Sequence, residues 1–239
     1  MSNVFPKWTN RLPLLVLVGG LLLGGGAVTG VSYYFTPKYT RVGYQPVQPV
    51  SFSHKVHAGE LGLDCRYCHD KVEESWFSNL PTASTCMNCH DSVLKDDPRL
   101  EPIRVSYFGE DTNRDGKLDK EEDKNGNGEN DRQPVPWVQI HKTPDYVYFD
   151  HSVHVTRGIS CVKCHGRVDE MDEVRHAKSL SMAFCLDCHR NAHDNIRPLG
   201  KVTDLDWHGG NDFVGATDGK KLMEKLDVKA RESCTACHR

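Results

Sequence analysis

All ten cysteines of the chain belong to five copies of one pattern, two cysteines separated by two residues and followed at once by a histidine. The copies are Cys65/Cys68/His69, Cys86/Cys89/His90, Cys161/Cys164/His165, Cys185/Cys188/His189 and Cys234/Cys237/His238. Two thiols one helical turn apart can add to the two vinyl groups of a haem while the adjacent histidine binds its iron. We therefore expect five haem c groups, each attached through both cysteines of one copy, with the histidine as the proximal iron ligand.

Other uses of paired cysteines explain this pattern less well. Zinc sites and redox dithiols also employ two cysteines separated by two residues, but neither requires a histidine directly afterwards. A disulfide framework would suit an exported protein rich in cysteine, yet it would leave the five adjacent histidines without a role. Haem attachment accounts for every cysteine and for the histidine after each pair.

An internal repeat supplies the first candidates for the distal iron ligands. The segment Phe52-Ser-His54-Lys-Val-His57 is matched by Phe149-Asp-His151-Ser-Val-His154, and each segment precedes two haem motifs. The first histidine lies 11 residues before the next cysteine in one copy and 10 in the other. Histidines three apart lie one helical turn from each other and can reach two different haems. We expect all four as distal ligands: His54, His57, His151 and His154.

The fifth distal ligand is less clearly marked. Met182 is the leading candidate. A thioether ligand would raise the potential of one haem above the others. His141 is the imidazole alternative, followed by Met171 or another histidine. The remaining histidines, His176, His193 and His208, are expected at the surface.

The elements that must position these residues begin with an apolar N-terminal segment. Residues 12–35 carry no charge for 24 positions, with Lys7 and Arg11 before them and Lys38 and Arg41 after them. About 20 apolar residues suffice to cross a bilayer. A cleaved signal peptide is the alternative, but its apolar region is shorter. Because haem c is attached outside the cytoplasm, we expect a single-pass anchor in the lipid of a bacterial inner membrane, with the haem domain in the periplasm.

The rest of the chain is expected to be mainly α with extensive loops, carried on this single transmembrane helix. Fewer than 200 residues serve five haems, so the porphyrins should supply most of the apolar filling. We divide the chain into a signal anchor (1–35), an extended linker (36–50), a first dihaem module (51–95), an acidic insertion with its connector (96–140), a second dihaem module (141–195) and a C-terminal segment with the fifth haem (196–239).

The acidic insertion contains a possible cation site. Residues 110–131 carry a net charge of −5 within a chain whose total is −3. One stretch matches a twelve-residue calcium loop, with Asp111, Asn113, Asp115, Lys117, Asp119 and Glu122 at the ligand positions and Gly116 at the turn. A second, partial copy starts at Asp123 but has Pro134 in place of the final glutamate. Bound Ca²⁺ and a solvated acidic loop are the two interpretations.

Three stretches together resemble a known family. They are Gln48-Pro-Val-Ser-Phe-Ser-His54-Lys-Val-His57, Lys142-Thr-Pro-Asp-Tyr-Val-Tyr-Phe-Asp-His151 and Leu180-Ser-Met182-Ala-Phe-Cys185. They look like the pentahaem subunit of alternative complex III, and the haem arrangement is similar to class III multihaem cytochromes. The class III resemblance implies that His54 binds the haem on Cys65 and Cys68, and that His151 binds the haem on Cys161 and Cys164. The pentahaem family implies one histidine–methionine haem, which favours Met182.

The resemblance implies partners as well as a fold. They are membrane and iron–sulfur subunits of a quinol-oxidising complex, with a monohaem cytochrome c or an oxidase as the electron acceptor, and no nucleic acid. We expect an electron relay that is no enzyme on its own. The alternatives are a direct membrane quinol dehydrogenase and a multihaem reductase with an open iron, which the supply of spare histidines disfavours.

Overall fold

The computed structural model describes residues 5–35, 41–111, 115, 117–123, 125–209 and 215–238. Within these ranges the chain consists of short helices joined by loops, with no β-strand and two isolated antiparallel bridges, Val147 with His238 and Ile159 with Ile196. The expectation of a mainly helical chain with extensive loops is confirmed. Two residues of the expected calcium loop, Asn113 and the turn glycine Gly116, lie outside the described residues.

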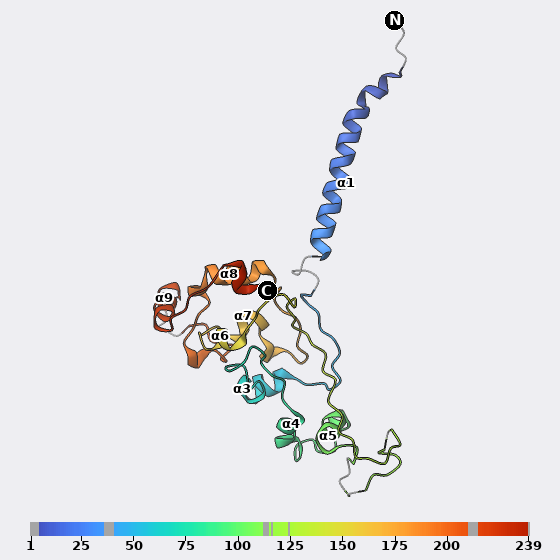
Figure 1. Ribbon diagram of the computed structural model, residues 1–239, viewed down its shortest axis with the longest axis vertical. Coiled ribbons are helices and arrows are strands. Elements are labelled where there is room, and N and C mark those ends of the chain that lie inside the picture. Colours follow the sequence, from blue (N-terminus) through green and yellow to red (C-terminus); the bar gives the residue numbers. More distant parts are fainter. Residues whose placement is uncertain are drawn as a thin grey trace.

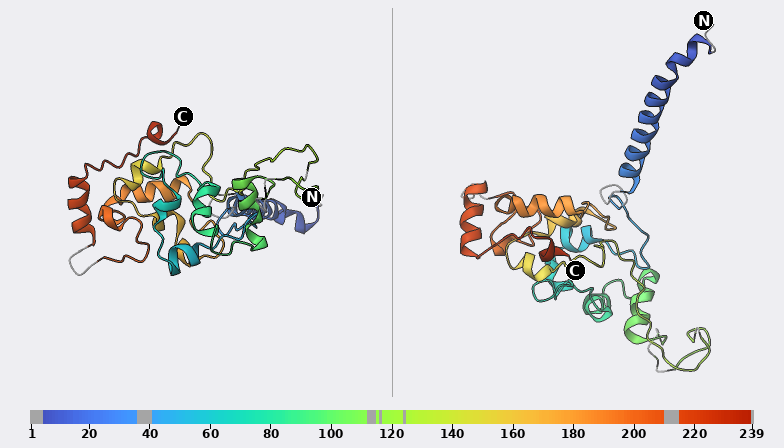
Figure 2. Two further views of the ribbon diagram at one scale, coloured as in Figure 1. Left: turned by 90° about the horizontal axis from the view of Figure 1, so that it is seen from below. Right: turned by 45° about the horizontal axis from the view of Figure 1, so that its top comes forward.

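The N-terminal helix α1 (Leu12–Phe35) projects away from the remaining chain (Figure 1 and the right view of Figure 2). It follows the short helix η1 (Lys7–Arg11). Within the stretch Lys7–Tyr34, an 18-residue window has a mean hydropathy of 2.1 and is 0% buried against the rest of the protein. A helix closes its own backbone hydrogen bonds, so an apolar one of this length can lie in lipid. This is the one described helix that is long and apolar enough to cross a membrane.

Most of the sequence motifs lie on short helices. Five of them carry the cysteine pairs: α3 (Cys65–Cys68), α4 (Ala83–His90), α7 (Cys161–His165), α8 (Met182–Arg190) and α10 (Cys234–Cys237). The two histidine pairs lie at η2 (Lys55–Glu60), which is a π-helical turn, and at α6 (His151–Val155). The others are η3 (Pro98–Leu100), α5 (Glu101–Phe108), η4 (Val168–Glu170), η5 (Ala192–Asp194), η6 (Leu199–Lys201) and α9 (Gly215–Lys225).

Side chains at the helix starts explain why such short helices form. Asp64 accepts a hydrogen bond from the backbone N–H of Arg66 at the start of α3, and Asp150 accepts two at the start of α6. Ser181 caps α8 in the same way. Each cap satisfies N–H groups that have no partner inside the helix and contributes about 1 kcal/mol. Among the helices that carry cysteine pairs, α3 and α8 have such a cap, whereas α4, α7 and α10 have no side-chain cap.

Apolar packing between the two modules is small in extent. Val72 of the first module, Val155 of the second and Val202 of the C-terminal segment form one buried cluster. A side chain at Gly59, in the first module, would overlap the carbonyl oxygen of Asp169 in the second. The backbones of the two modules are therefore in direct contact at this point.

Residues 41–50 of the linker are extended and lie along the domain. Tyr44 and Gly43 pair with the backbone of His176, at 2.9 and 2.8 Å. The side chain of Gln48 donates to the carbonyl of Val138 and accepts from its N–H, at 2.9 and 3.0 Å. Residues 41–50 are thus held between two later stretches of the chain.

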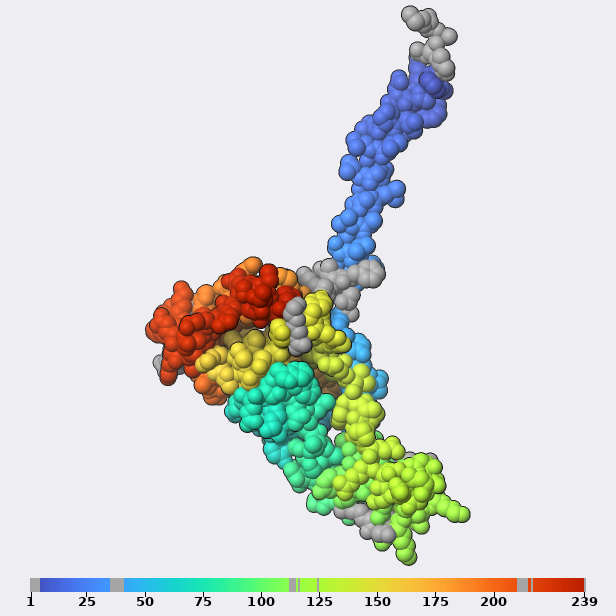
Figure 3. Space-filling model, in the orientation of Figure 1, coloured from blue at the N-terminus to red at the C-terminus, as the bar shows by residue number. Residues whose placement is uncertain are grey.

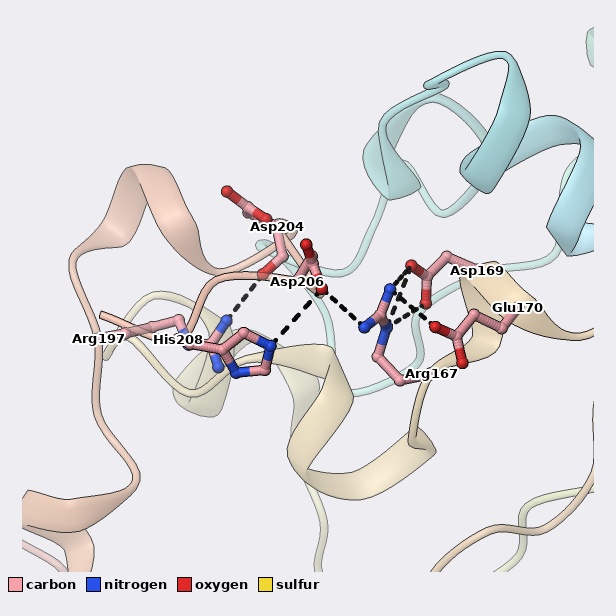
Figure 4. A network of polar contacts seen from close by, with 7 residues as sticks. All are labelled: Arg167, Asp169, Glu170, Arg197, Asp204, Asp206 and His208. Atoms are coloured by element: carbon pink, nitrogen blue, oxygen red, sulfur yellow. Dashed lines mark hydrogen bonds and ion pairs between the residues drawn. The ribbon is translucent and has the colours of Figure 1, made fainter. Parts of the chain in front are cut away.

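A polar network around Arg167 secures the C-terminal loop (Figure 4). The Arg167 guanidinium pairs with Asp169 at 2.7 Å and with Glu170 at 3.2 Å on its own side, and with Asp206 at 2.9 Å across the gap between segments. In the same view Arg197 donates to the carbonyl oxygen of Asp204 at 2.8 Å. These contacts tie residues 197–208 to the loop that follows α7.

The acidic insertion forms a lobe at the end of the molecule remote from α1 (Figure 1, Figure 3). Asn130 closes its base, accepting from the N–H of Asp111 at 3.0 Å and donating to the carbonyl of Phe108 at 3.1 Å. Glu110, which is 2% exposed, accepts a 3.4 Å hydrogen bond from Gln133. The lobe is therefore attached to α5, which packs against α4 of the second haem motif through Ile103 and Met87.

Candidate haem-binding sites

Three proximal histidines face a distal candidate at nearly the same separation. The ring centroids are 6.2 Å apart for His57 and His90, and 6.2 Å for His154 and His189. His151 and His165 are 6.3 Å apart, with ring planes only 9° from parallel. Imidazole nitrogens bind metals at about 2 Å, which puts two rings on opposite sides of one metal roughly 6 Å apart. The spacing of each pair leaves room for one metal ion between the rings.

Six of the proximal and distal candidates share a hydrogen-bonding arrangement. Each places its Nδ1 against a backbone carbonyl at 2.7–2.9 Å: His57 to Ser53, His69 to Asn79, His90 to Val93, His151 to Trp76, His154 to Asp150 and His189 to Arg231. A carbonyl can only accept, so Nδ1 carries the proton. Nε2 is then left with its lone pair, which is how proteins orient histidine ligands.

Burial keeps several of these rings neutral, as metal ligation requires. It lowers the pKa of His54 to about 4, with His69 and His57 adding to the shift, which places His54 beside the first motif. Burial also lowers the pKa of His165 to about 3, helped by His141 and His151. Uncharged imidazoles are thus present at the first and third motifs.

Two phenylalanines, one in each repeat, pack against the histidine pairs and orient their rings. This role was not predicted from the sequence. Phe52 stacks on His57 with centroids 4.3 Å apart, and Phe149 stacks on His154 at 4.9 Å. The same rings meet the first histidine of each pair edge-on, at 4.8 Å in both copies. Their identical place in the two repeats was the signal that could have revealed them.

The surroundings of His238 differ from those of the other proximal histidines. Its ring faces that of Tyr146 at 5.8 Å, and the preceding residue, Cys237, accepts a 2.7 Å hydrogen bond from the N–H of Tyr148. Met182 begins α8 and is 62% exposed, whereas Met171 is 8% exposed and packed in the interior. Met182 is therefore the more accessible of the two methionines.

The expectation that His176 lies at the surface is wrong. It is 1% exposed and stacks on His141 with centroids 5.0 Å apart. The extended linker covers it, because the backbone of His176 pairs with Gly43 and Tyr44. The side chain of His208 is 82% exposed, as expected, and that of His193 is 28% exposed. No local sequence pattern around His176 predicts its burial, because the segment that covers it is distant in the sequence.

The residues present fit haem c. Each cysteine pair lies on one turn of helix, the histidine rings have their Nε2 atoms free, and the paired rings stand apart by the width that one metal requires. The ten thiols are free of disulfides. The site chemistry matches a covalently attached, low-spin haem with two axial ligands.

Contacts between motifs follow an order that differs from the sequence. Cys65 of the first motif lies beside Cys161 of the third, and each thiol shifts the pKa of the other. Asn88 of the second motif donates to the hydroxyl of Tyr67 in the first at 3.2 Å. The motifs thus touch in the order second, first, third.

The remaining motifs extend the same line. Burial raises the pKa of Cys164 in the third motif to about 11, and the neighbouring thiols Cys188 and Cys185 of the fourth add to the shift. Arg190, directly after the fourth motif, pairs with Glu232 at 3.0 Å, just before the fifth. Burial also raises the pKa of Cys185, with the Cys237 thiol as the next cause. The complete order is second, first, third, fourth, fifth.

The attaching cysteines differ in exposure. Cys89 of the second motif is exposed, as is Cys234 of the fifth, whereas the other eight are partly buried. The reason lies in α4, whose buried residue Met87 precedes Cys89 by two positions. Residues two apart point to opposite sides of a helix, so Cys89 faces away from the packed side. The exposed thiols lie in the two motifs at the ends of the line of contacts.

The described residues of the calcium-like loops form local turns. Asp115 accepts from the N–H of Lys117 at 2.8 Å, and Glu122 accepts from the N–H of Asp119 at 3.4 Å. In the second copy, Asp123 accepts from the N–H groups of Gly126 and Gly128 at 2.6 and 2.9 Å. Across the described ranges, no three histidine, cysteine or acidic side chains gather closely enough to hold a metal ion.

Two comparisons with known proteins agree with this geometry. The family model for "Cytochrome c7 and related cytochrome c" matches residues 50–114 and 147–239. The chain is also 32% identical over 200 residues to the menaquinone reductase, multiheme cytochrome c subunit, of Nitratidesulfovibrio vulgaris. That alignment covers 82% of this chain and 78% of the relative. The family match omits residues 115–146, which hold most of the acidic insertion.

Proposed function

Because this chain belongs to the family of cytochrome c7 and related cytochrome c proteins and is a multihaem electron-transfer protein, we propose that it relays electrons within a membrane complex that exchanges them with a quinone pool. Five haems are attached at its five motifs. Four of the irons have two histidine ligands, through His54, His57, His151 and His154, and the fifth has His238 and Met182. Irons with both axial positions filled exchange electrons but bind no substrate.

The unbroken line of contacts between the motifs supports this proposal most strongly. A relay needs neighbouring haems along its whole length. Here residues of successive motifs lie near one another, from the Asn88–Tyr67 hydrogen bond at one end, through the neighbouring cysteines of the first, third and fourth motifs, to the Arg190–Glu232 pair at the other. The haems of the second and fifth motifs are then the two ends of the relay, where they exchange electrons with partners. The exposure of one attaching cysteine in each of these motifs supports this role.

The sequence resemblance favours electron flow outward, from a quinol-oxidising core with iron–sulfur and membrane subunits to a cytochrome c or oxidase. The named relative belongs to a menaquinone reductase, and its name favours the opposite direction, into menaquinone. In both cases the chain is an electron-transfer subunit. Helix α1 anchors it in the bacterial inner membrane, with the haem domain in the periplasm.

Isolation of the tagged chain, alone and with the subunits that copurify, tests this function. We expect the complex, but not the chain alone, to exchange electrons rapidly with menaquinol or menaquinone. An electron paramagnetic resonance titration should count five low-spin haems per chain. Rapid reduction of the isolated chain by menaquinol would instead identify a direct quinol dehydrogenase. A high-spin haem that binds nitrite would identify a reductase.

The order of the relay has a separate test. Replacing His57 by Met raises the midpoint potential of the second haem. This haem is then reduced at solution potentials at which it was oxidised before the replacement. The neighbouring first haem then has one positive charge fewer beside it, and its potential falls. We expect this shift in the first haem and none in the fifth. Equal shifts in both would contradict a linear order.

The acidic lobe is proposed to bind Ca²⁺ through Asp111, Asn113, Asp115, Asp119 and Glu122, with the backbone carbonyl of Lys117 as a further ligand. The loop pattern and the carboxylate turns at Asp115 and Glu122 support this. The role of the ion is structural, because it would hold together a lobe with few apolar contacts.

A further inference from the structure

Arg41, His141 and His176 form a buried cluster between the extended linker and the third haem motif, here called the tether cluster. His141 and His176 stack at 5.0 Å, and the ring of His141 meets that of His165 at 4.4 Å and 84°. Four nitrogens of the cluster are buried without a hydrogen-bond partner among the described residues: Nε of Arg41, Nε2 of His141, and both ring nitrogens of His176.

The contacts of Arg41 leave its charge without a counter-ion. One NH group donates to the carbonyl of Ile140 at 2.8 Å, and the guanidinium lies 5.0 Å from the centre of the Tyr44 ring. In the part of the chain that the structure describes, no carboxylate pairs with it. A guanidinium in partly desolvated surroundings normally pairs with a carboxylate or phosphate. The cluster therefore lacks an anion.

Four unpartnered nitrogens in one place cannot be dismissed as incidental. A buried polar group without a hydrogen bond destabilises the fold, and native proteins contain few of them. His176 is 1% exposed, so solvent does not satisfy its ring. Through His141 the cluster adjoins the ring of His165, the proximal histidine of the third motif. The missing partner thus belongs next to the haem of that motif.

We propose that Arg41, His141 and His176 bind the propionate carboxylates of the haem attached at Cys161 and Cys164. A carboxylate accepts hydrogen bonds from both guanidinium and imidazole N–H groups, and bonds to ionised partners are the strong ones. The inference rests on haem attachment at the third motif, and so on the proposed function, but not on the direction of electron flow. The tether cluster couples the end of the membrane anchor to that haem.

The same residues are poorly placed to bind an iron. His141 lies 4.4 Å from His165, shorter than the roughly 6 Å that separates two rings across one metal. His165 already faces His151 at 6.3 Å in nearly parallel planes. His141 is thus a neighbour of the proximal ligand and not the second ligand of its iron.

The experiment compares three variants of the full chain, Arg41→Gln, His141→Gln and His176→Gln, with Arg104→Gln. Arg104 is a matched control, because its guanidinium also donates to carbonyl oxygens, those of Lys95 and Asp97, at 3.0 and 2.9 Å. Only preparations with five covalent haems per chain are used. The readouts are the propionate bending modes in resonance Raman spectra and the five midpoint potentials.

In the tether-cluster variants we expect the propionate modes to shift while all five haems stay low-spin. Arg41→Gln should also lower one of the five midpoint potentials, because removal of a nearby positive charge stabilises the oxidised haem. Arg41→Lys should keep that potential, and Arg104→Gln should change neither readout. Unchanged propionate modes would overturn the proposal. A high-spin haem in the His141 or His176 variant would also overturn it. So would a midpoint potential that changes when phosphate is added while the propionate Raman modes stay unchanged.

These readouts are independent of quinone chemistry. They are made at equilibrium on the isolated chain. A chain that failed to exchange electrons with its complex would still give the Raman and potential shifts. The failure of the proposed function and the failure of this inference are therefore distinguishable.

Discussion

His57 faces His90 at 6.2 Å, although the motif that follows His57 in the sequence is the first and His90 belongs to the second. The corresponding residue of the repeat, His154, faces His189 of the fourth motif at the same distance. In each repeat the second histidine thus reaches past the nearer motif to the next one. A single turn of helix contributes to two sites, which draws those sites together.

The first prediction concerns these pairs. His57→Ala removes the sixth ligand of the second haem, so we expect one of the five low-spin signals to be replaced by a high-spin signal in electron paramagnetic resonance. That haem should also bind carbon monoxide, and added imidazole should restore the low-spin state. His208→Ala, at a side chain that is 82% exposed, is the control. Five unchanged signals in His57→Ala would rule out the assignment.

Met182→Leu tests the fifth haem. Loss of the thioether should remove the highest of the five potentials and leave one high-spin iron, because leucine cannot bind iron. Met171→Leu is the matched control, since Met171 is 8% exposed and packs in the interior. We expect it to lower the thermal stability by less than about 1.5 kcal/mol without any spin change. If only the Met171 variant becomes high-spin, the assignment must be reversed.

Calcium binding is tested by titration calorimetry on the chain stripped with a chelator. The double variant Asp111→Ala and Glu122→Ala removes a monodentate and a bidentate carboxylate from the first loop, so we expect its binding signal to disappear. Asp123→Ala, in the second loop, should leave that signal in place. A full signal in the double variant would show that the first loop does not bind calcium.

Asp64→Asn should reduce stability at neutral pH but not in acid. Hydrogen bonds from the Arg66 side chain lower the pKa of Asp64 to about 2, against burial, which acts to raise it. The unfolded chain binds this proton with a pKa near 3.9. The carboxylate therefore stabilises the fold fully above about pH 4, and this contribution is lost as the pH falls towards 2.

Asparagine can still cap α3, so the substitution isolates the charge. The loss at pH 7 should be about 1 kcal/mol or less, because solvent screens the partly exposed pair. Thermal unfolding between pH 7 and pH 2 measures it. Asp145→Asn, at a side chain that is 94% exposed, is the control and should show no such pH dependence. A deficit that persists at pH 2 would mean that packing, not charge, is responsible.

Arg167→Gln tests the network that secures the C-terminal loop. Arg167 joins three carboxylates from two segments, whereas Arg190 pairs with Glu232 alone at a more exposed site. We expect Arg167→Gln to cost about 1 kcal/mol in thermal unfolding, and Arg190→Gln less than about half of that. Faster proteolysis within residues 197–208 should accompany the first variant only. Equal losses would mean that the network adds nothing beyond single pairs.

The sequence predicted the parts of this protein that depend on local spacing. Covalent haem attachment requires two thiols and a histidine within one turn, so the five motifs were visible without a structure. The helix α1 and the helical, loop-rich character followed from hydropathy and from the shortage of apolar residues. The repeat of phenylalanine and paired histidines could be read from the chain, but the stacking of Phe52 and Phe149 could not.

Which motifs touch, and in what order, was decided only by the tertiary structure. The Cys65–Cys161 contact, the burial of His176 under the linker and the position of Arg41 beside His141 all join segments far apart in the chain. No local pattern encodes them, because they arise from the way backbone segments cross. The five haem motifs are thus a property of the sequence, whereas their arrangement as a line from the second to the fifth is a property of the fold.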